Sequence, residues 1–330
     1  MPAQWIQITS HEDRRWRHFL HEVPVVPFSW DPRFLAIAQS VFHYQPHSFL
    51  LVNGEQPRAG GVFLVRERLG NAYATAPFFA FYLPILAIEP AIYKRYHDID
   101  TFLQFVEEQF QSVECVTLPG MMLCLPFRWR GWQIQVSASG LLPIENPEKT
   151  LMAMEAEERR LVRRAVENDA LQIVRAVDLR EFYQLLRTVY QRHRKNPPLP
   201  LQQFEAFLNQ LQMVQLGHVL GVVVKERLVA ATVIIPYGNT VHGLLLARQL
   251  DALGSQAAMK LIWHVATTYS EAGMEWYDLG GLDVPSIADF KLKIGAQPRM
   301  VYRCRFLKNK KTQMLYQLAE IKNKTLRKLR

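Results

Sequence analysis

The stretch YDLGGLDVPSIADFKLKIG, residues 277–295, combines fixed charge with a flexible backbone. Asp278 precedes the pair Gly280 and Gly281, and Phe290 and Lys291 follow in the next segment. Glycines let a backbone approach a ligand closely, and an aspartate before them either orders the turn or accepts a proton. The turn-forming role is favoured for Asp278, because Asp is a common turn former before glycine. The stretch is typical of a loop that shapes a small-molecule or phosphate pocket.

A second candidate site is the start of a helix near residue 254. We expect Ser255 to be its N-cap after Gly254, and apolar residues at helical spacing continue to a stop at Gly273. Free N–H groups and the positive end of the helix dipole suit a phosphate there. An ordinary capped helix explains the same residues equally well. The candidate donor-binding residues of this segment are Gly254, Ser255, Gln256 and Ala257.

Regular elements must position these residues. Residues 217–249 alternate Val- and Ile-rich runs with turn signals, which predicts a three-strand antiparallel meander, and residues 48–77 show a weaker echo of it. Helices are expected within residues 151–169, from Leu179 behind the capping-box pair Asp178 and Glu181, and over 201–213. MEWYDLGG then resumes as a strand. Residues 71–88 lack charge, but Pro77 and Pro84 favour buried strand and loop over a membrane span.

Bulk properties bound the function. A chain of 330 residues with 49% hydrophobic content predicts two globular units. Residues 308–330 hold eight basic residues against Glu320, which leaves only +2 of the net +9 for the body, so charge alone does not indicate a nucleic-acid-binding fold.

The three cysteines are odd in number and form no Cys-x-x-Cys pair, which argues against a disulfide framework and favours a reducing compartment. The N-terminus lacks a signal-peptide pattern, so we expect a cytoplasmic protein. Motifs of serine hydrolases, zinc proteases, P-loop enzymes and dinucleotide binders are absent, and no metal site is expected.

Four stretches, taken in order, resemble the GNAT acyltransferase superfamily and more closely its FemABX peptidyltransferase branch. They are RRLVRRAVENDALQIVRA, EFYQLLRTVYQRH, YSEAGMEWYDLGG and FKLKIGAQP. The second carries a Thr-x-x-x-Arg pattern at Thr188 and Arg192. The resemblance covers about residues 150–300 by motif and the first half by architecture. It implies an α+β fold of two tandem GNAT-like domains, each a mixed, mainly antiparallel sheet flanked by helices.

The resemblance also implies roles for single residues. It makes Lys291 and Asp278 candidate catalytic residues, with Lys291 holding a donor phosphate or stabilising the oxyanion. It also adds Gly280, Gly281 and Phe290 to the candidate donor-binding residues. Acceptor-binding candidates are Arg192, Arg194 and Trp30. A guanidinium matches phosphate or carboxylate, but arginines at a helix C-terminus also complement the dipole, and Trp30 fits a core position as well. The loop RQLDALGSQA departs from the usual coenzyme A pattern, which puts pyrophosphate binding in question.

The expected organisation is a first, acceptor-side domain over 1–150, a donor-side domain over 151–307 and a basic helical tail over 308–330. We expect transfer of an aminoacyl or acyl group onto an amine, such as a cell-wall or envelope precursor, with aminoacyl-tRNA or acyl-CoA as donor and no tightly bound cofactor. The alternatives are a coenzyme A-dependent N-acetyltransferase and a non-catalytic module that binds the inner membrane surface through the tail. Catalysis requires two neighbouring strands in the last third to part, leaving a slot for the donor carbonyl.

Overall fold

The computed structural model describes residues 4–309 except 69, 78, 122, 123 and 193, and the chain divides into two compact units. Of the described residues, the first unit comprises those of 4–137 and 300–309, and the second comprises those of 138–299. The expected tail over 308–330 lies outside the described residues apart from Lys308 and Asn309. In the described part of the chain, no helix is both long and apolar enough to cross a bilayer.

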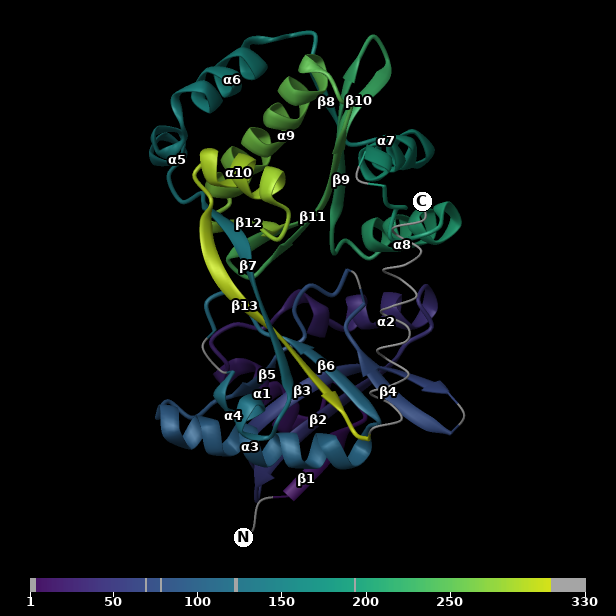
Figure 1. The fold of residues 1–330 in the computed structure, drawn as a ribbon, viewed down its shortest axis with the longest axis vertical. Coiled ribbons are helices and arrows are strands. Elements are labelled where there is room, and N and C mark those ends of the chain that lie inside the picture. The colour runs from purple at the N-terminus through teal and green to yellow at the C-terminus, as the bar shows by residue number, and fades with distance from the viewer. Residues whose placement is uncertain (1–3, 69, 78, 122–123, 193, 310–330) are drawn as a thin grey trace. The chain divides into compact units, whose positions relative to one another are not determined.

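The first unit is built on an antiparallel meander packed against helices (Figure 1). Its sheet runs in the order β1-β2-β3-β4-β6-β13, with β5 on β3, and only β4 and β6 pair in parallel. The strands are β1 Gln4–Ile8, β2 Gln45–Asn53, β3 Gln56–Arg68, β4 Asn71–Thr75, β5 Ile85–Ala87, β6 Ser112–Val116 and β13 Gln297–Leu307. The helices are α1 Arg14–Glu22, the 3₁₀ turn Phe28–Trp30, α2 Pro32–Ser40, α3 Ile92–Gln109 and α4 Leu125–Trp129.

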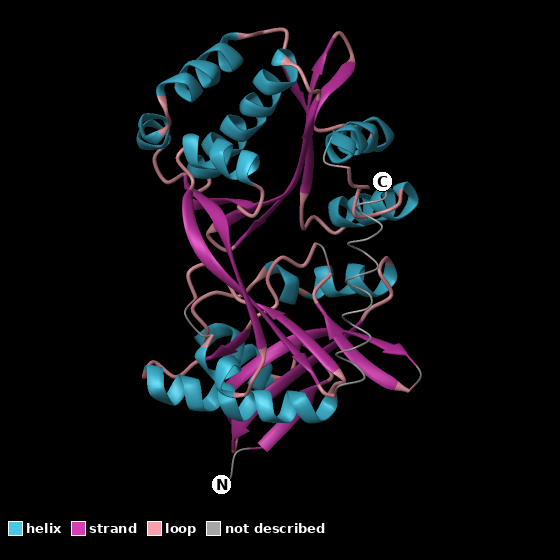
Figure 2. Cartoon of the chain, viewed as in Figure 1, coloured by secondary structure: helices cyan, strands magenta, loops and turns pink. Residues whose placement is uncertain are grey.

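The second unit has a sheet in the order β7-β12-β11-β10-β9-β8, antiparallel except between β11 and β12. The strands are β7 Gln133–Pro143, β8 Gln172–Val174, β9 His218–Val224, β10 Arg227–Tyr237, β11 Thr240–Arg248 and β12 Trp276–Gly281. The helices are α5 Pro147–Ala153, α6 Ala156–Glu167, α7 Leu179–Arg192, α8 Leu201–Met213, α9 Ala252–Glu271 and α10 Pro285–Lys293. Figures 1 and 2 show α6 and α9 on one face of this sheet and α7 and α8 on the other.

Local signals explain most of the second unit. The helix expected from Leu179 begins there, because the Asp178 carboxylate accepts the Glu181 N–H at 3.2 Å. The reciprocal half of the capping box is absent, since the Glu181 carboxylate accepts the N–H of Leu228 instead. The long helix α9 buries Leu261, Ile262 and Val265 against the sheet, and each such side chain contributes roughly 1.5–3 kcal/mol of burial free energy.

The boundaries between the units fall within strands, not at the expected residues 150 and 307. Leu142 and Ile144 belong to the core of the second unit, so that core begins before α5. The last strand returns to the first unit: β13 pairs with β6 from Arg303 to Leu307. Glu114 on β6 forms ion pairs with both Arg303 and Arg305 of β13, which reinforces this pairing.

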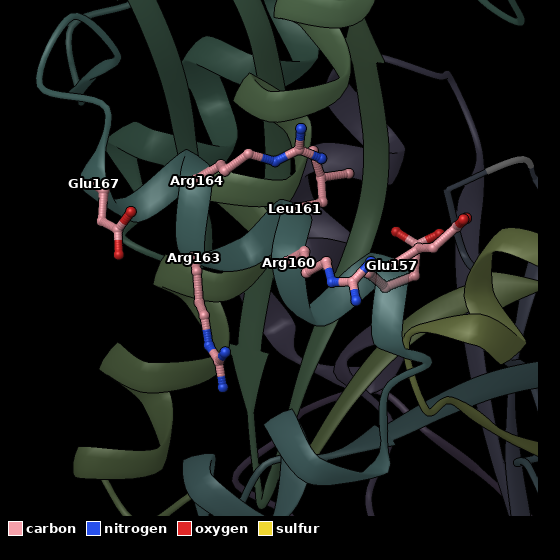
Figure 3. Close-up of a pocket in the computed structure, with 7 residues that line it drawn as sticks. Glu157, Arg160, Leu161, Arg163, Arg164 and Glu167 are labelled. Carbon is pink, nitrogen blue, oxygen red and sulfur yellow. The ribbon is translucent and has the colours of Figure 1, made fainter.

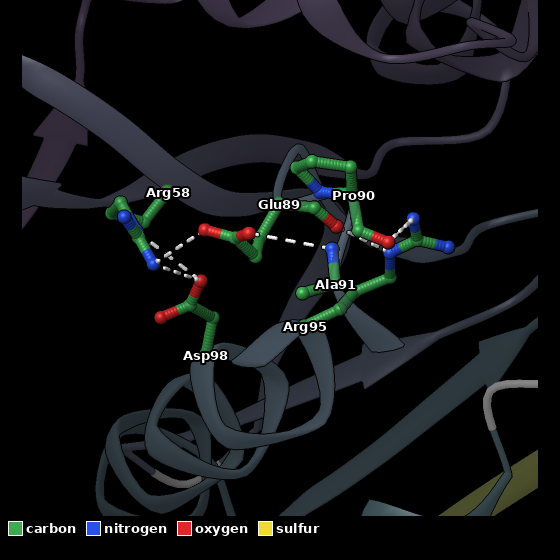
Figure 4. A network of polar contacts seen from close by, with 6 residues as sticks. All are labelled: Arg58, Glu89, Pro90, Ala91, Arg95 and Asp98. Carbon is green, nitrogen blue, oxygen red and sulfur yellow. Dashed lines mark hydrogen bonds and ion pairs between the residues drawn. The ribbon is translucent and has the colours of Figure 1, made fainter. Parts of the chain in front are cut away.

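A polar network fixes the start of α3 to β3 in the first unit (Figure 4). The Arg58 guanidinium pairs with Asp98 at 3.0 Å and with Glu89 at 3.3 Å. Glu89 also accepts the Ala91 N–H, which supplies a cap that Ala91 itself lacks. Burial raises the pKa of Asp98, and the charge of Arg58 opposes that rise. Arg95 donates only to the carbonyl oxygens of residues 89 and 90.

Arg58→Leu should lower the free energy of unfolding by about 2–4 kcal/mol at neutral pH, because it leaves the buried carboxylate of Asp98 and the partly buried carboxylate of Glu89 without their cation. The loss should shrink at about pH 5, where Asp98 takes up a proton more readily in the folded chain than in the unfolded one. Urea unfolding at both pH values measures this. Arg95→Leu, which removes no carboxylate partner, serves as the control and should cost under about 1 kcal/mol. Equal losses for the two variants would contradict the role given to Arg58.

Candidate active site

The strands β11 and β12 part from one another in the second unit. They pair in parallel at three positions only, ending at His242 opposite Asp278. Beyond this point β11 stays paired with β10 as far as Arg248, whereas β12 shifts register and pairs with β7 at Gly281 opposite Ser139. We call the point of separation the strand fork. The separation that the sequence-based expectation required is therefore present.

Gly280 turns β12 at the strand fork. Its φ is +77°, in the left-handed region that residues with a Cβ avoid, so glycine is required there. The N–H of Gly280 donates to Oδ1 of Asp278 at 2.9 Å. Asp278 thus orders the glycine turn, the role that the sequence favoured. Gly281 has no positive φ, and a Cβ there would approach only Asp283, at 3.7 Å.

Three strands converge on the Asp278 carboxylate. Its side chain is 1% exposed. Ser139 of β7 donates its hydroxyl to Oδ1 at 2.6 Å, and Nδ1 of His242 on β11 lies 3.4 Å from Oδ2. These partners compensate the burial of a charge that would otherwise be costly. We call Ser139, His242 and Asp278 the carboxylate cluster.

Lys291 of α10 joins the same region. Its Nζ donates to the carbonyl oxygen of Gly281 at 2.9 Å. Burial lowers the pKa of Lys291 from its ordinary 10.5 to about 8, and the nearby charges of Asp278 and Asp283 oppose that shift. The neighbouring Phe290 packs partly buried against the core of the unit. The structure therefore brings together Asp278, Gly280, Gly281 and Lys291, as the motif predicted.

The start of α9 differs from the prediction. The N-cap is Asp251, not Ser255, and the helix begins at Ala252. The Asp251 carboxylate accepts the Gly254 N–H at 2.7 Å, while the Ser255 hydroxyl donates to the Asp251 carbonyl. A Cβ on Gly254 would lie 2.1 Å from the carbonyl oxygen of Gln249, so this glycine serves close backbone packing.

The other two predicted donor residues of α9 also have structural partners. Ala257 is fully buried in the core of the unit. The Gln256 side chain accepts a hydrogen bond from Asn168, in the segment after α6, at 3.3 Å. The donor-binding role assigned to this helix start therefore gains no side-chain support from the structure.

Two predicted acceptor residues lie at the end of α7. Arg192 is the last residue of the helix, and Arg194 follows with a φ of +53°; both are exposed. Helix α7 packs on β11, and burial together with the charge of Arg192 lowers the pKa of Arg248 at the end of β11. Arg248 itself donates to the carbonyl oxygens of Gln249 and Asp251. Arg192 and Arg248 thus lie near one another at the end of β11 that has separated from β12.

Trp30 does not fit the acceptor role that the resemblance implied. Its side chain is 1% exposed, within the first unit. It packs against Trp16 and Phe19, with ring centroids 5.8 and 6.2 Å away. The alternative interpretation as a core tryptophan is the one that the structure supports.

A shallow hollow of about 720 Å³ lies along the exposed face of α6 (Figure 3). Figure 3 shows Arg163 and Arg164 extending in different directions from the helix, while Arg160 lies beside Glu157. Three arginines and three glutamates line the hollow together with Leu161, so their charges balance. The arginines of this helix therefore do not form a strong anion site.

Sequence reasoning missed Ser139, His242 and Asp251. A histidine within the apolar run TVHGLLL was a usable signal for His242, since a polar residue in a buried strand needs a partner. Asp251, three residues before Gly254, was as good an N-cap as Ser255. Ser139 meets a partner 139 residues away, and no local pattern indicates that contact.

Comparisons with known proteins agree with this geometry. Residues 154–292 match the family model of an acetyltransferase (GNAT) domain. The solved structure of FemX has a TM-score of 0.70 at 11% identity, covering 96% of this chain and 99% of FemX. A tandem GNAT protein from the clavulanic acid biosynthesis pathway has a TM-score of 0.58 at 8% identity, covering 93% of this chain and 99% of that protein. The structure of L-PGS from Bacillus licheniformis has a TM-score of 0.50 at 13% identity, covering 93% of this chain and 94% of L-PGS. No curated protein matches the sequence.

The family model and the fold define the class of protein: an acyltransferase with a GNAT fold. More particularly, residues 154–292 match the GNAT domain model, and the chain shares its fold with FemX and with a tandem GNAT protein, in agreement with the resemblance of its ordered motifs. The predicted fold class is also confirmed.

Gly280→Ala should lower the free energy of unfolding by about 1–2 kcal/mol, the usual cost of placing a Cβ in left-handed backbone. Gly281→Ala should change it by less than about 0.5 kcal/mol, because its position has room and no positive φ. Urea unfolding of the two variants measures the difference. Equal stability of both would contradict the turn described here.

The free energy of unfolding should rise with pH between about 8 and 10.5 through Lys291. The folded chain releases the Lys291 proton in this window while the unfolded chain keeps it, so raising the pH favours the folded state. Urea unfolding at about pH 7 and about pH 9.5 measures the rise. Lys291→Met should weaken it, whereas Lys293→Met, on the same helix, should retain it. An identical pH dependence in wild type and Lys291→Met would contradict the lowered pKa.

Proposed function

We propose that this chain transfers an aminoacyl group from an aminoacyl-tRNA to an amine of a cell-wall or envelope precursor. The observation that carries the proposal is the position of Lys291 at the strand fork, with its Nζ on the Gly281 carbonyl oxygen. A slot between parting strands holds a donor carbonyl beside the lysine, so that positioning supplies much of the rate. No covalent intermediate on the protein is needed.

Lys291 stabilises the charge that develops on the carbonyl oxygen. Its pKa of about 8 keeps it largely protonated at neutral pH, and its partial burial strengthens the interaction with an oxyanion. A cation in this position also suits a phosphate of the donor. Asp278 acts as a positioning residue, because its contacts with Ser139 and Gly280 fix the turn to which Lys291 is bound.

The choice of aminoacyl-tRNA over coenzyme A rests on Asp251. A pyrophosphate binds a helix start through free N–H groups and the positive dipole end. In this chain the Asp251 carboxylate already accepts the Gly254 N–H, and its negative charge repels a phosphate at the same place. A coenzyme A-dependent N-acyltransferase therefore remains the second candidate. Arg192, at the end of α7, and Arg248, at the end of β11, are the proposed contacts for an anionic group of the acceptor.

Purified protein should transfer radiolabelled amino acid from a mixture of charged tRNAs to a nucleotide-linked peptide with a free side-chain amine. Lys291→Met should lower kcat by about 10²–10³, the usual loss when an oxyanion donor is removed. Lys293→Met, two residues along α10 and paired with Asp289, is the matched control and should keep wild-type turnover.

Turnover with acetyl-CoA but not with charged tRNA would contradict the aminoacyl transfer and support the coenzyme A-dependent N-acyltransferase instead. Wild-type turnover by Lys291→Met would contradict the proposed role of Lys291 in stabilising the oxyanion.

A further inference from the structure

His242 occupies the last paired position before β11 and β12 separate. It stands directly opposite Asp278 in the register, so both side chains lie on the same face of the sheet at the strand fork. The His242 side chain is 11% exposed, against 1% for Asp278. Both side chains are buried, and the imidazole is the less completely buried member of the pair.

The orientation of the imidazole is set by the carboxylate. Nδ1 faces Oδ2 of Asp278 at 3.4 Å, slightly longer than an ordinary hydrogen bond. Such contacts are often long without substrate and tighten in the reacting complex. A proton on Nδ1 satisfies the carboxylate, and this tautomer makes Nε2 the basic nitrogen. Ser139 and the Gly280 N–H hold Oδ1 of the same carboxylate, so Asp278 has little freedom to turn away.

We propose that His242 is the general base that takes the proton from the acceptor amine. The proposal rests on the acyl transfer proposed above and adds a second catalytic residue to it. The amine nitrogen attacks the ester carbonyl of the donor, the C–N bond forms and the N–H proton passes to Nε2. The ester C–O bond breaks, and the imidazolium returns one proton to the leaving oxygen, so the base is regenerated.

Asp278 is the positioning residue in this scheme. Its negative charge stabilises the imidazolium as it forms and keeps the proton of the neutral ring on Nδ1. Charged and titratable groups near the pair include Lys291 of α10, whose pKa responds to the charges of Asp278 and Asp283, and Tyr277, which precedes Asp278 on β12. Asp278 thus contacts His242 directly and influences Lys291 electrostatically, and the two side chains have opposite tasks: Lys291 stabilises negative charge and His242 accepts a proton.

His242→Gln should lower kcat by about 10²–10⁴ with a charged-tRNA donor and an alkylamine-bearing acceptor, with little change in KM, because a general base contributes that factor. Hydroxylamine is unprotonated at neutral pH, so after subtraction of the uncatalysed reaction it should restore most of the loss. His218→Gln, at the start of β9, is the matched control and should keep wild-type rates.

The tautomer of His242 is a readout that does not require turnover. Nitrogen-15 NMR of the imidazole, assigned by its loss in His242→Gln, should show the proton on Nδ1 in wild type, and Asp278→Asn should shift the ring toward the other tautomer. A proton on Nε2 in wild type overturns the inference, with or without activity.

Two further outcomes separate the inference from the proposed function. Wild-type turnover by a folded His242→Gln overturns the inference and leaves the acyl transfer standing. Absence of turnover in wild type with charged tRNA and with acetyl-CoA overturns both.

Discussion

The buried carboxylate of Asp278 is the contact on which the second unit depends. Three strands supply its partners: Ser139 from β7, His242 from β11 and the Gly280 N–H from β12 itself. A charge that is 1% exposed requires such partners, so the three strands are held in one arrangement. The turn at Gly280 follows from this arrangement, and the carbonyl that anchors Lys291 follows from the turn. Separation of the strands and placement of the cation thus have one cause.

Local charge matters more in this protein than total charge. The net +9 is concentrated at the end of the chain, and the arginines of α6 are balanced by glutamates around the same hollow. The cations with distinctive surroundings are fewer. Lys291 is lowered in pKa by burial, and Arg248 is lowered by burial and by its neighbour Arg192. Desolvated cations interact more strongly with an anion than solvated ones do, which is why these positions carry the proposed chemistry.

Sequence patterns predicted the elements of the second unit well, because their signals are local. Val- and Ile-rich runs between turns predicted the meander, and Asp178 marked the first residue of α7. The same reasoning placed the N-cap of α9 at Ser255, because two suitable cap residues stand four apart and only packing at Gly254 decides between them.

Contacts between distant strands could not be predicted in this way. Ser139 and Asp278 meet only once β7 and β12 pair, and Trp30 is buried by residues of a different helix. The family resemblance located Asp278 and Lys291 by motif, but it carried no information on His242.

The return of β13 to the first unit sets an order on the assembly of the chain during synthesis. β6 finds its antiparallel partner only after Arg303 to Leu307 have left the ribosome, when the whole of residues 138–299 has already emerged. Until then the first unit exposes an unfinished sheet edge, including the buried Cys115 that will face Cys304. The second unit, whose residues are contiguous, has all of its own strands available first. The last of the described strands to be made therefore completes the first unit to be started.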